Sequence, residues 1–134
     1  MPDVAERLRT FLIAGASVTA IVGQRVHQNM VPESSAPPYL WFRRSRTDEP
    51  RTLDGGSPSG YEQFFDIECV SEDLSEAQTL AYAVRDRLNN YRGSFADSTV
   101  KGIFVEDHSD DYVPRSVSSD DVAHVAALSV QIIP

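Results

Sequence analysis

The sequence of 134 residues predicts an α+β fold with a mainly antiparallel sheet. Three observations lead to this class: an amphipathic helical pattern in the middle of the chain, alternating apolar and polar segments on both sides of it, and the lack of the regular strand–helix alternation that builds parallel sheets. A chain of this length buries roughly 65–70% of its unfolded surface. One core is therefore sufficient, and a single domain over residues 1–134 is expected.

The N-terminal segment is expected to hold a helix that docks on the core. It begins with Asp3 as its cap and runs to about Ala14. Ser17 is expected to cap a second short turn, which continues through Ile21 and is closed by Gly23.

The same segment superficially resembles a secretory signal peptide, because Arg7 and Arg9 precede the apolar stretch Phe11–Val22. Acidic residues in the leader and the interruption at Gly15 favour the amphipathic helix instead. The stretch is too short to span a membrane.

Residues 25–31 alternate in polarity and are expected to form a strand, which Pro32 and residues 34–38 end. Two aromatic-rich strands follow, Tyr39–Arg46 and Tyr61–Val70, and are expected to pair as antiparallel neighbours. Their polarity pattern predicts the register if the apolar positions face the core. The predicted cross-strand pairs are Leu40 with Cys69, Phe42 with Ile67 and Arg43 with Asp66. Tyr39, Trp41 and Phe64 would then lie on the second face, which needs a cover from a helix or from a neighbouring subunit.

The clearest element is a central helix packed on the sheet. Asp73 or Ser75 caps it, Gly93 ends it, and Arg85, Asp86 and Arg87 lie on its solvent side. Its apolar residues recur at helical spacing: Leu74, Ala77, Leu80, Ala81, Val84, Leu88 and Tyr91.

Two further strands are expected after a short polar link, Val100–Glu106 and His124–Ile133. In the second, Ala126, Leu128, Val130 and Ile132 form one face. The acidic segment 108–121 between them is expected to be a loop with a short strand around Tyr112–Val117.

The connection Thr47–Gly60 is unusually long for a hairpin, which two to five residues commonly close. It is rich in glycine, proline and charge, so it cannot bury itself. Such a loop on a small domain is typical of a contact arm that a partner orders, or of a disordered segment.

The net charge of −8 argues against a broad nucleic-acid-binding face. A local basic patch nevertheless lies in and beside the hairpin. The candidate interface residues are Arg43, Arg44, Arg46, Arg51, Leu53 and Asp54. They either contact an acidic surface, including that of another copy, or form a solvated strand end.

No motif for catalysis or cofactor binding is present. The P-loop, GxGxxG and GxSxG patterns are missing, and His27, His108 and His124 lack metal-ligand spacing. An acidic cluster could attract a hard cation; its residues are Glu106, Asp107, Asp110 and Asp111. It lacks the spacing of an EF-hand, so a solvated acidic turn is the favoured interpretation. The single cysteine, Cys69, is expected in the core. We therefore expect no catalytic residue, cofactor or metal, and no enzyme.

The order of these elements resembles the tail-completion or tail-terminator proteins of long-tailed bacteriophages over nearly the whole chain. The motifs that carry the resemblance are the helix with Leu8 and Leu12, Val18–Gly23, Arg25-Val26, Pro37-Pro38-Tyr39-Leu40, Phe65-Asp66-Ile67-Glu68, the helix Ala77–Leu88 with Ala83-Val84-Arg85, and the closing strand.

The resemblance implies a structural virion protein, made in the bacterial host cytoplasm and located at the head–tail junction. It implies a homo-hexameric ring that caps the head-proximal end of the tail tube, ends tube polymerisation and joins the tail to the head. The implied partners are other copies of the chain, the tail tube protein and a neck protein, with DNA passing through the ring without specific binding and no contact with a membrane. Two alternatives remain: another neck component, such as a head-closure or adaptor protein, and a metal-dependent hydrolase using the acidic cluster.

Overall fold

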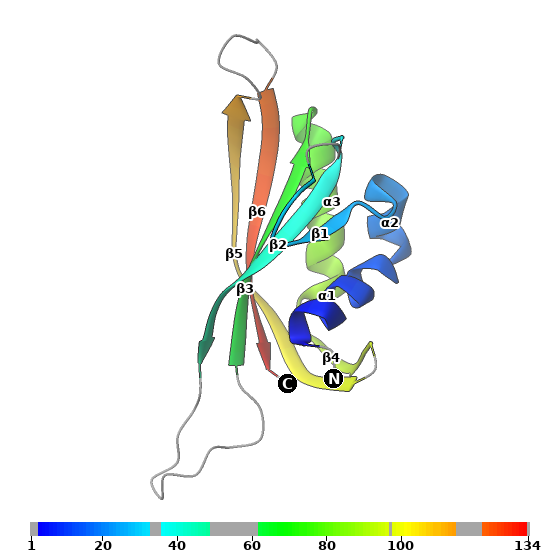
Figure 1. Cartoon of the computed structure of the whole chain (residues 1–134), viewed down its shortest axis with the longest axis vertical. Helices are drawn as coiled ribbons and strands as arrows, with labels where there is room; N and C mark the ends of the chain where they lie inside the picture. Colours follow the sequence, from blue (N-terminus) through cyan, green and yellow to red (C-terminus); the bar gives the residue numbers. More distant parts are fainter. Residues whose placement is uncertain (1–2, 33–35, 49–61, 97, 115–121, 134) are drawn as a thin grey trace, which may run out of the picture.

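The computed structural model describes residues 3–32, 36–48, 62–96, 98–114 and 122–133. Within these residues, three helices lie on one face of a six-stranded sheet with strand order β1-β2-β3-β6-β5-β4 (Figure 1). The elements are α1 (Val4–Ile13), α2 (Ala16–Val22), β1 (Val26–Gln28), β2 (Tyr39–Asp48), β3 (Glu62–Ser71), α3 (Leu74–Leu88), β4 (Tyr91–Phe95), β5 (Ser98–Pro114) and β6 (Val122–Ile133). All strand pairs are antiparallel except β1 with β2. The predicted α+β class is confirmed.

The first helix begins as the sequence predicts. The Asp3 carboxylate accepts a hydrogen bond from the Val4 amide, so Asp3 is the N-cap of α1. The predicted cap of α2 is wrong, because α2 begins directly after Gly15 and has no side-chain cap. Gly23 ends α2 at φ 59°, a left-handed conformation that glycine adopts without strain.

The strand that precedes the hairpin is shorter than predicted. β1 covers only Val26–Gln28, because Asn29 turns the chain at φ 67°. Met30, which the alternation assigned to a strand, is 79% exposed. The short strand still matters, because it pairs in parallel with the start of β2.

The predicted hairpin register is confirmed. The structure pairs Leu40 with Cys69, Phe42 with Ile67 and Arg43 with Asp66. The register shifts between Arg44 and Arg46, a β-bulge that the polarity pattern does not reveal. The long connection between the strands falls mostly on residues 49–61, outside the described residues.

The central helix ends earlier than predicted. Asp73 caps α3 by accepting a hydrogen bond from the Ser75 amide, and the helix stops at Leu88. Asn90 then adopts φ 61°, which reverses the chain into β4, so Gly93 lies in a strand and does not end the helix. Leu74 is 41% exposed and does not belong to the buried stripe.

The acidic segment after the central helix is also different from the prediction. β5 continues through residues 108–111, which were expected in a loop, because they pair with β6. The short strand expected around Tyr112–Val117 is present over Tyr112–Pro114 as the end of β5, which pairs with β6 as far as Val122. Residues 115–121 lie outside the described part of the chain. The predicted strand 124–133 is confirmed, and its four predicted core residues are buried.

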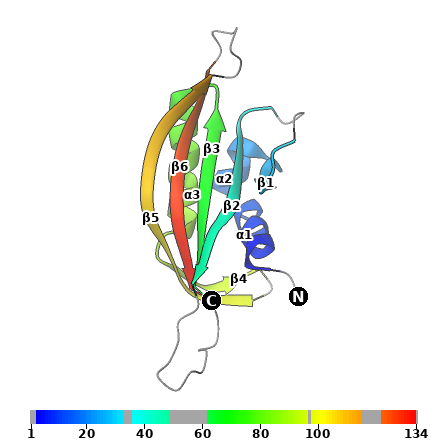
Figure 2. The same ribbon diagram turned by 60° about the vertical axis from the view of Figure 1, so that its left-hand side comes forward.

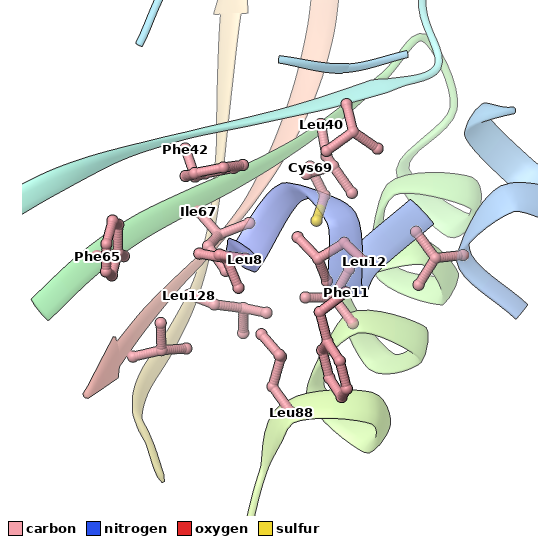
Figure 3. Packing of buried hydrophobic residues seen from close by; sticks show 14 of the residues in the cluster. Leu8, Phe11, Leu12, Leu40, Phe42, Phe65, Ile67, Cys69, Leu88 and Leu128 are labelled. Atoms are coloured by element: carbon pink, nitrogen blue, oxygen red, sulfur yellow. The ribbon is translucent and has the colours of Figure 1, made fainter. Parts of the chain in front are cut away.

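The main core lies between the sheet and the helices. Leu8 and Leu12 of α1 and Leu88 of α3 converge on Phe42, Ile67, Leu128 and the other inward residues of the sheet (Figure 3). Cys69 is fully buried among them, as expected, and burial raises the pKa of its thiol. None of the described helices combines the length and the apolar character that crossing a membrane requires.

Candidate assembly surface

The second face of the sheet has no helix over it in the described part of the chain (Figure 2). We call it the open face. Successive side chains of a strand point to opposite faces of the sheet. The residues that alternate with the buried core residues therefore lie on the open face. Its main residues are Tyr39, Trp41, Arg43 and Arg46 of β2, Phe64, Asp66, Glu68 and Val70 of β3, Phe104 and Asp107 of β5, and Val125, Ala127, Ser129 and Gln131 of β6.

A small apolar cluster lies on the open face beside β1. Val70 and Val125 are buried there beneath the half-buried side chains of Tyr39 and Trp41. The His27 ring meets Tyr39 edge to face, with centroids 6.1 Å apart. The predicted placement of these aromatic residues on the second face is thus confirmed.

The middle of the open face is charged and shallow. Trp41, Arg43, Asp66 and Glu68 help to line a hollow of about 120 Å³, and Arg46 and Glu106 border another of about 180 Å³. Pockets for drug-sized ligands measure roughly 300–1,000 Å³. Both hollows are smaller than this range.

The β-bulge determines which arginines reach the open face. Regular alternation would direct Arg46 to the helix side together with Arg44. The register shift instead pairs Arg46 with Phe64, and its guanidinium carbon lies 4.0 Å from the centre of that ring. This cation–π contact covers Phe64. As a result, Arg43 and Arg46 lie on the same face.

Arg44 points to the helix side of the sheet and forms an ion pair within the chain. One of its terminal nitrogens donates to both carboxylate oxygens of Asp3, at 2.5 and 2.6 Å. This hydrogen bonding, opposed by partial burial, lowers the pKa of Asp3. The predicted basic patch is therefore divided between two faces. Arg51, Leu53 and Asp54 lie outside the described residues, and the interface role of all six residues remains a prediction.

The acidic cluster is also divided by the strand that carries it. Asp107 lies on the open face, whereas Asp110 accepts a hydrogen bond from Gln78 of α3 at 3.3 Å. The His108 ring meets the ring of Tyr82, also on α3, with centroids 5.3 Å apart. Among the residues that the structure describes, no group of three or more His, Cys, Asp and Glu side chains is arranged to hold a metal ion.

Comparison with known proteins is consistent with this architecture. A family model described as "Tail completion protein gp17" matches residues 6–129. A chain from the virion of a native gene transfer agent particle superposes with a TM-score of 0.63 at 19% identity, over 93% of this chain and 90% of that chain. Another solved chain, which carries no functional description, matches with a TM-score of 0.51 at 14% identity, over 95% and 94% of the two chains.

No curated protein sequence matches the chain. At identities below 20%, the two structural likenesses show the fold alone. The family match, in contrast, covers nearly the whole sequence and confirms the resemblance that the order of elements indicates. The chain belongs to the tail completion protein gp17 family and is a structural protein of the bacteriophage virion tail.

Proposed function

We propose that copies of this chain form a ring, most simply a homo-hexamer, that caps the head-proximal end of the tail tube. The ring ends tube polymerisation and presents the surface that a neck protein binds. The whole chain acts as one assembly domain. The tail tube protein and the neck protein contact opposite faces of the ring.

The open face of the sheet is the observation that carries this proposal. Tyr39 and Trp41 remain half-buried on it, Phe104 is 41% exposed, and arginine and carboxylate side chains lie between them. Interfaces between proteins combine aromatic anchors with arginine in this way. A surface of this kind supports assembly with other virion proteins.

The charge of the chain supports passage of DNA without binding. Six copies, each with a formal charge of −8, would give a ring charge of about −48. An acidic ring repels the phosphate backbone and so offers DNA no broad binding surface.

Electron microscopy of particles made without this protein tests the proposal. A tail terminator predicts overlong tubes when it is missing, because nothing ends their growth. Tails of normal length together with heads that leak DNA would contradict the terminator role and indicate a head-closure protein. Re-expression of the wild-type chain should restore normal tails in the first case.

A further inference from the structure

Part of β2 and part of β5 pair with a neighbouring strand on one side and not on the other, within the described residues. β1 pairs with β2 at Leu40–Phe42, and within the described residues no strand continues this pairing along Arg43–Asp48. β4 pairs with β5 only as far as Ile103, so no described strand pairs with the outer side of Glu106–Pro114. We call Arg43–Asp48 the basic edge and Glu106–Pro114 the acidic edge.

The two edges carry opposite charge. The basic edge has the sequence RRSRTD, with three arginines and one aspartate. The acidic edge has the sequence EDHSDDYVP, with four carboxylates and no lysine or arginine. An unpaired edge is a template for pairing with another chain, and charged residues commonly prevent this. The net charge of each edge disfavours pairing of like edges, and the opposite net charges favour pairing of unlike ones.

We propose that neighbouring copies join by pairing the basic edge of one subunit with the acidic edge of the next, so that their sheets continue across the interface. This inference rests on the proposed ring, and it names the surfaces through which the ring closes. The partner is a second copy of this chain.

The strand order gives this contact a direction. β2, β3, β6 and β5 are successively antiparallel, so β2 and β5 run in opposite directions within one subunit. A rotation about an axis along the strands preserves these directions, and the new pair is then antiparallel like its neighbours. Because each subunit contributes two different edges, the contact is heterologous, and such a contact generates a ring when the rotation between neighbours closes.

The position of the edges sets the tilt of the strands. Arg43, Asp66, Ser129 and Asp107 lie in one cross-strand row, and the two edges extend from this row toward opposite ends of the molecule (Figure 1). For the basic edge of one subunit to lie beside the acidic edge of the next, the two subunits must be displaced along the strand direction by about five residues, or roughly 17 Å. Across four strands, roughly 19 Å wide, this corresponds to a strand tilt of about 40°, within the range of closed sheets.

Charge reversal on each edge provides the main test. Variant A carries Arg43→Glu and Thr47→Glu, and variant B carries Glu106→Lys, Asp107→Lys and Ser109→Lys. Variant A changes the net charge of the basic edge from +2 to −1, and variant B changes that of the acidic edge from −4 to +1. Both leave the contact of Arg46 with Phe64 in place. Particle mass is measured in solution with tail tube protein present, and thermal unfolding checks that each variant is folded.

Each variant alone should lose the ring-sized species that the wild type forms, because both of its edges then carry like charge. An equimolar mixture should recover it. The acidic edge of variant A then meets the basic edge of variant B, and the two altered edges, with net charges of −1 and +1, also attract each other. Two control variants carry equal charge changes elsewhere: Arg92→Glu with Ser94→Glu on β4, and Asp86→Lys and Thr79→Lys on α3 with Glu6→Lys on α1. Both should assemble as the wild type does.

Cross-linking gives a second readout that does not depend on charge. Ser45 and Ser109 both lie toward the open face, one on each edge. Oxidation of the Ser45→Cys, Ser109→Cys double variant should give a ladder of covalent multimers, whereas each single variant should give no species above a dimer.

Assembly of variant A or B at the wild-type level, or a mixture no better than its components, would overturn the edge pairing. So would a cross-linking ladder that ends at the dimer. If edge variants of this kind still restored normal tail length in particles lacking the protein, the terminator role would stand and only the edge pairing would fall. Normal tails without the protein would instead reject the proposed function itself.

Discussion

Arg87 links the last turn of α3 to the end of α1. Its Nε donates to the Phe11 carbonyl at 2.7 Å, and its guanidinium carbon lies 4.0 Å from the centre of the Phe11 ring. The side chain also runs across Gly15, which directly precedes α2. The helical pattern assigns Arg87 to the solvent side, but the structure shows it half-buried in this joint.

A side chain at Gly15 is expected to displace Arg87 from its contacts with Phe11. A Cβ at position 15 would lie 2.4 Å from Arg87 Cδ, so Gly15→Ala should lower the free energy of unfolding by about 1–3 kcal/mol. Denaturant unfolding measures this change. The control is the same substitution in an Arg87→Ala background, where it should cost much less. Additive costs of the two substitutions would contradict a direct clash.

His27 is expected to make folding stability depend on pH near neutrality. Burial, together with the charges of Arg9 and Arg25, lowers the pKa of His27 below its usual 6.5. The fold therefore favours neutral imidazole, and its contribution is complete above pH 6.5 and declines as pH falls below that value.

Unfolding measured at pH values from 7.5 to 5 should show this decline, and His27→Gln should remove it. An unchanged slope in the variant would assign the effect to another group. Asp3 acts in a separate window, because its lowered pKa affects stability only near and below its usual value of 3.8.

At the scale of single elements, α3 contributes most of its packing through one face. Leu80 is fully buried against the sheet, whereas Leu74 at the start of the helix is 41% exposed. Leu80→Ala should therefore lower the free energy of unfolding by about 2–5 kcal/mol, and Leu74→Ala, the matched control, should change it by less than about 0.5 kcal/mol. Equal costs at the two positions would contradict the observed burial.

The elements that the sequence predicts correctly are those whose pattern is tied to the core. The hairpin register follows from Leu40 and Phe42 because a one-residue slip would place both side chains on the open face. The bulge at Arg44–Arg46 has no such signal, because charged residues occupy both sides of it. Residues 108–111 are polar, and they form a strand through backbone pairing with β6, which composition does not reveal.

At the scale of the whole molecule, the connection between β2 and β3 is expected to matter for assembly and not for folding. Deletion of Leu53–Ser59 removes only residues outside the described structure, while the paired ends of the two strands keep their register. The variant should unfold like the wild type, because shortening a long loop changes its closure entropy only slightly.

Particle mass with tail tube protein present should show weaker assembly of this variant. Assembly at the wild-type level would contradict a contact role for the loop. A replacement of the same seven residues by a glycine–serine segment of equal length is the matched control for loop length.

The candidate surface could be predicted only in part. The sequence places Tyr39, Trp41 and Arg43 on a second face, and the structure confirms this. It does not show that Arg44 is held by Asp3, since the two residues are 41 positions apart in the chain. The unpaired edges were also not predictable, because they depend on where β1 and β4 stop.

The single cysteine of the chain is buried, so it does not interfere with labelling of a second cysteine introduced on the surface of the folded chain. Cys69 is fully buried, and its raised thiol pKa leaves almost no reactive thiolate at neutral pH. A thiol reagent therefore modifies the native protein only when the core opens, and its rate of reaction reports that opening. A cysteine introduced on either strand edge can carry a fluorophore without prior removal of Cys69, so association of subunits and unfolding can be followed by the same chemistry.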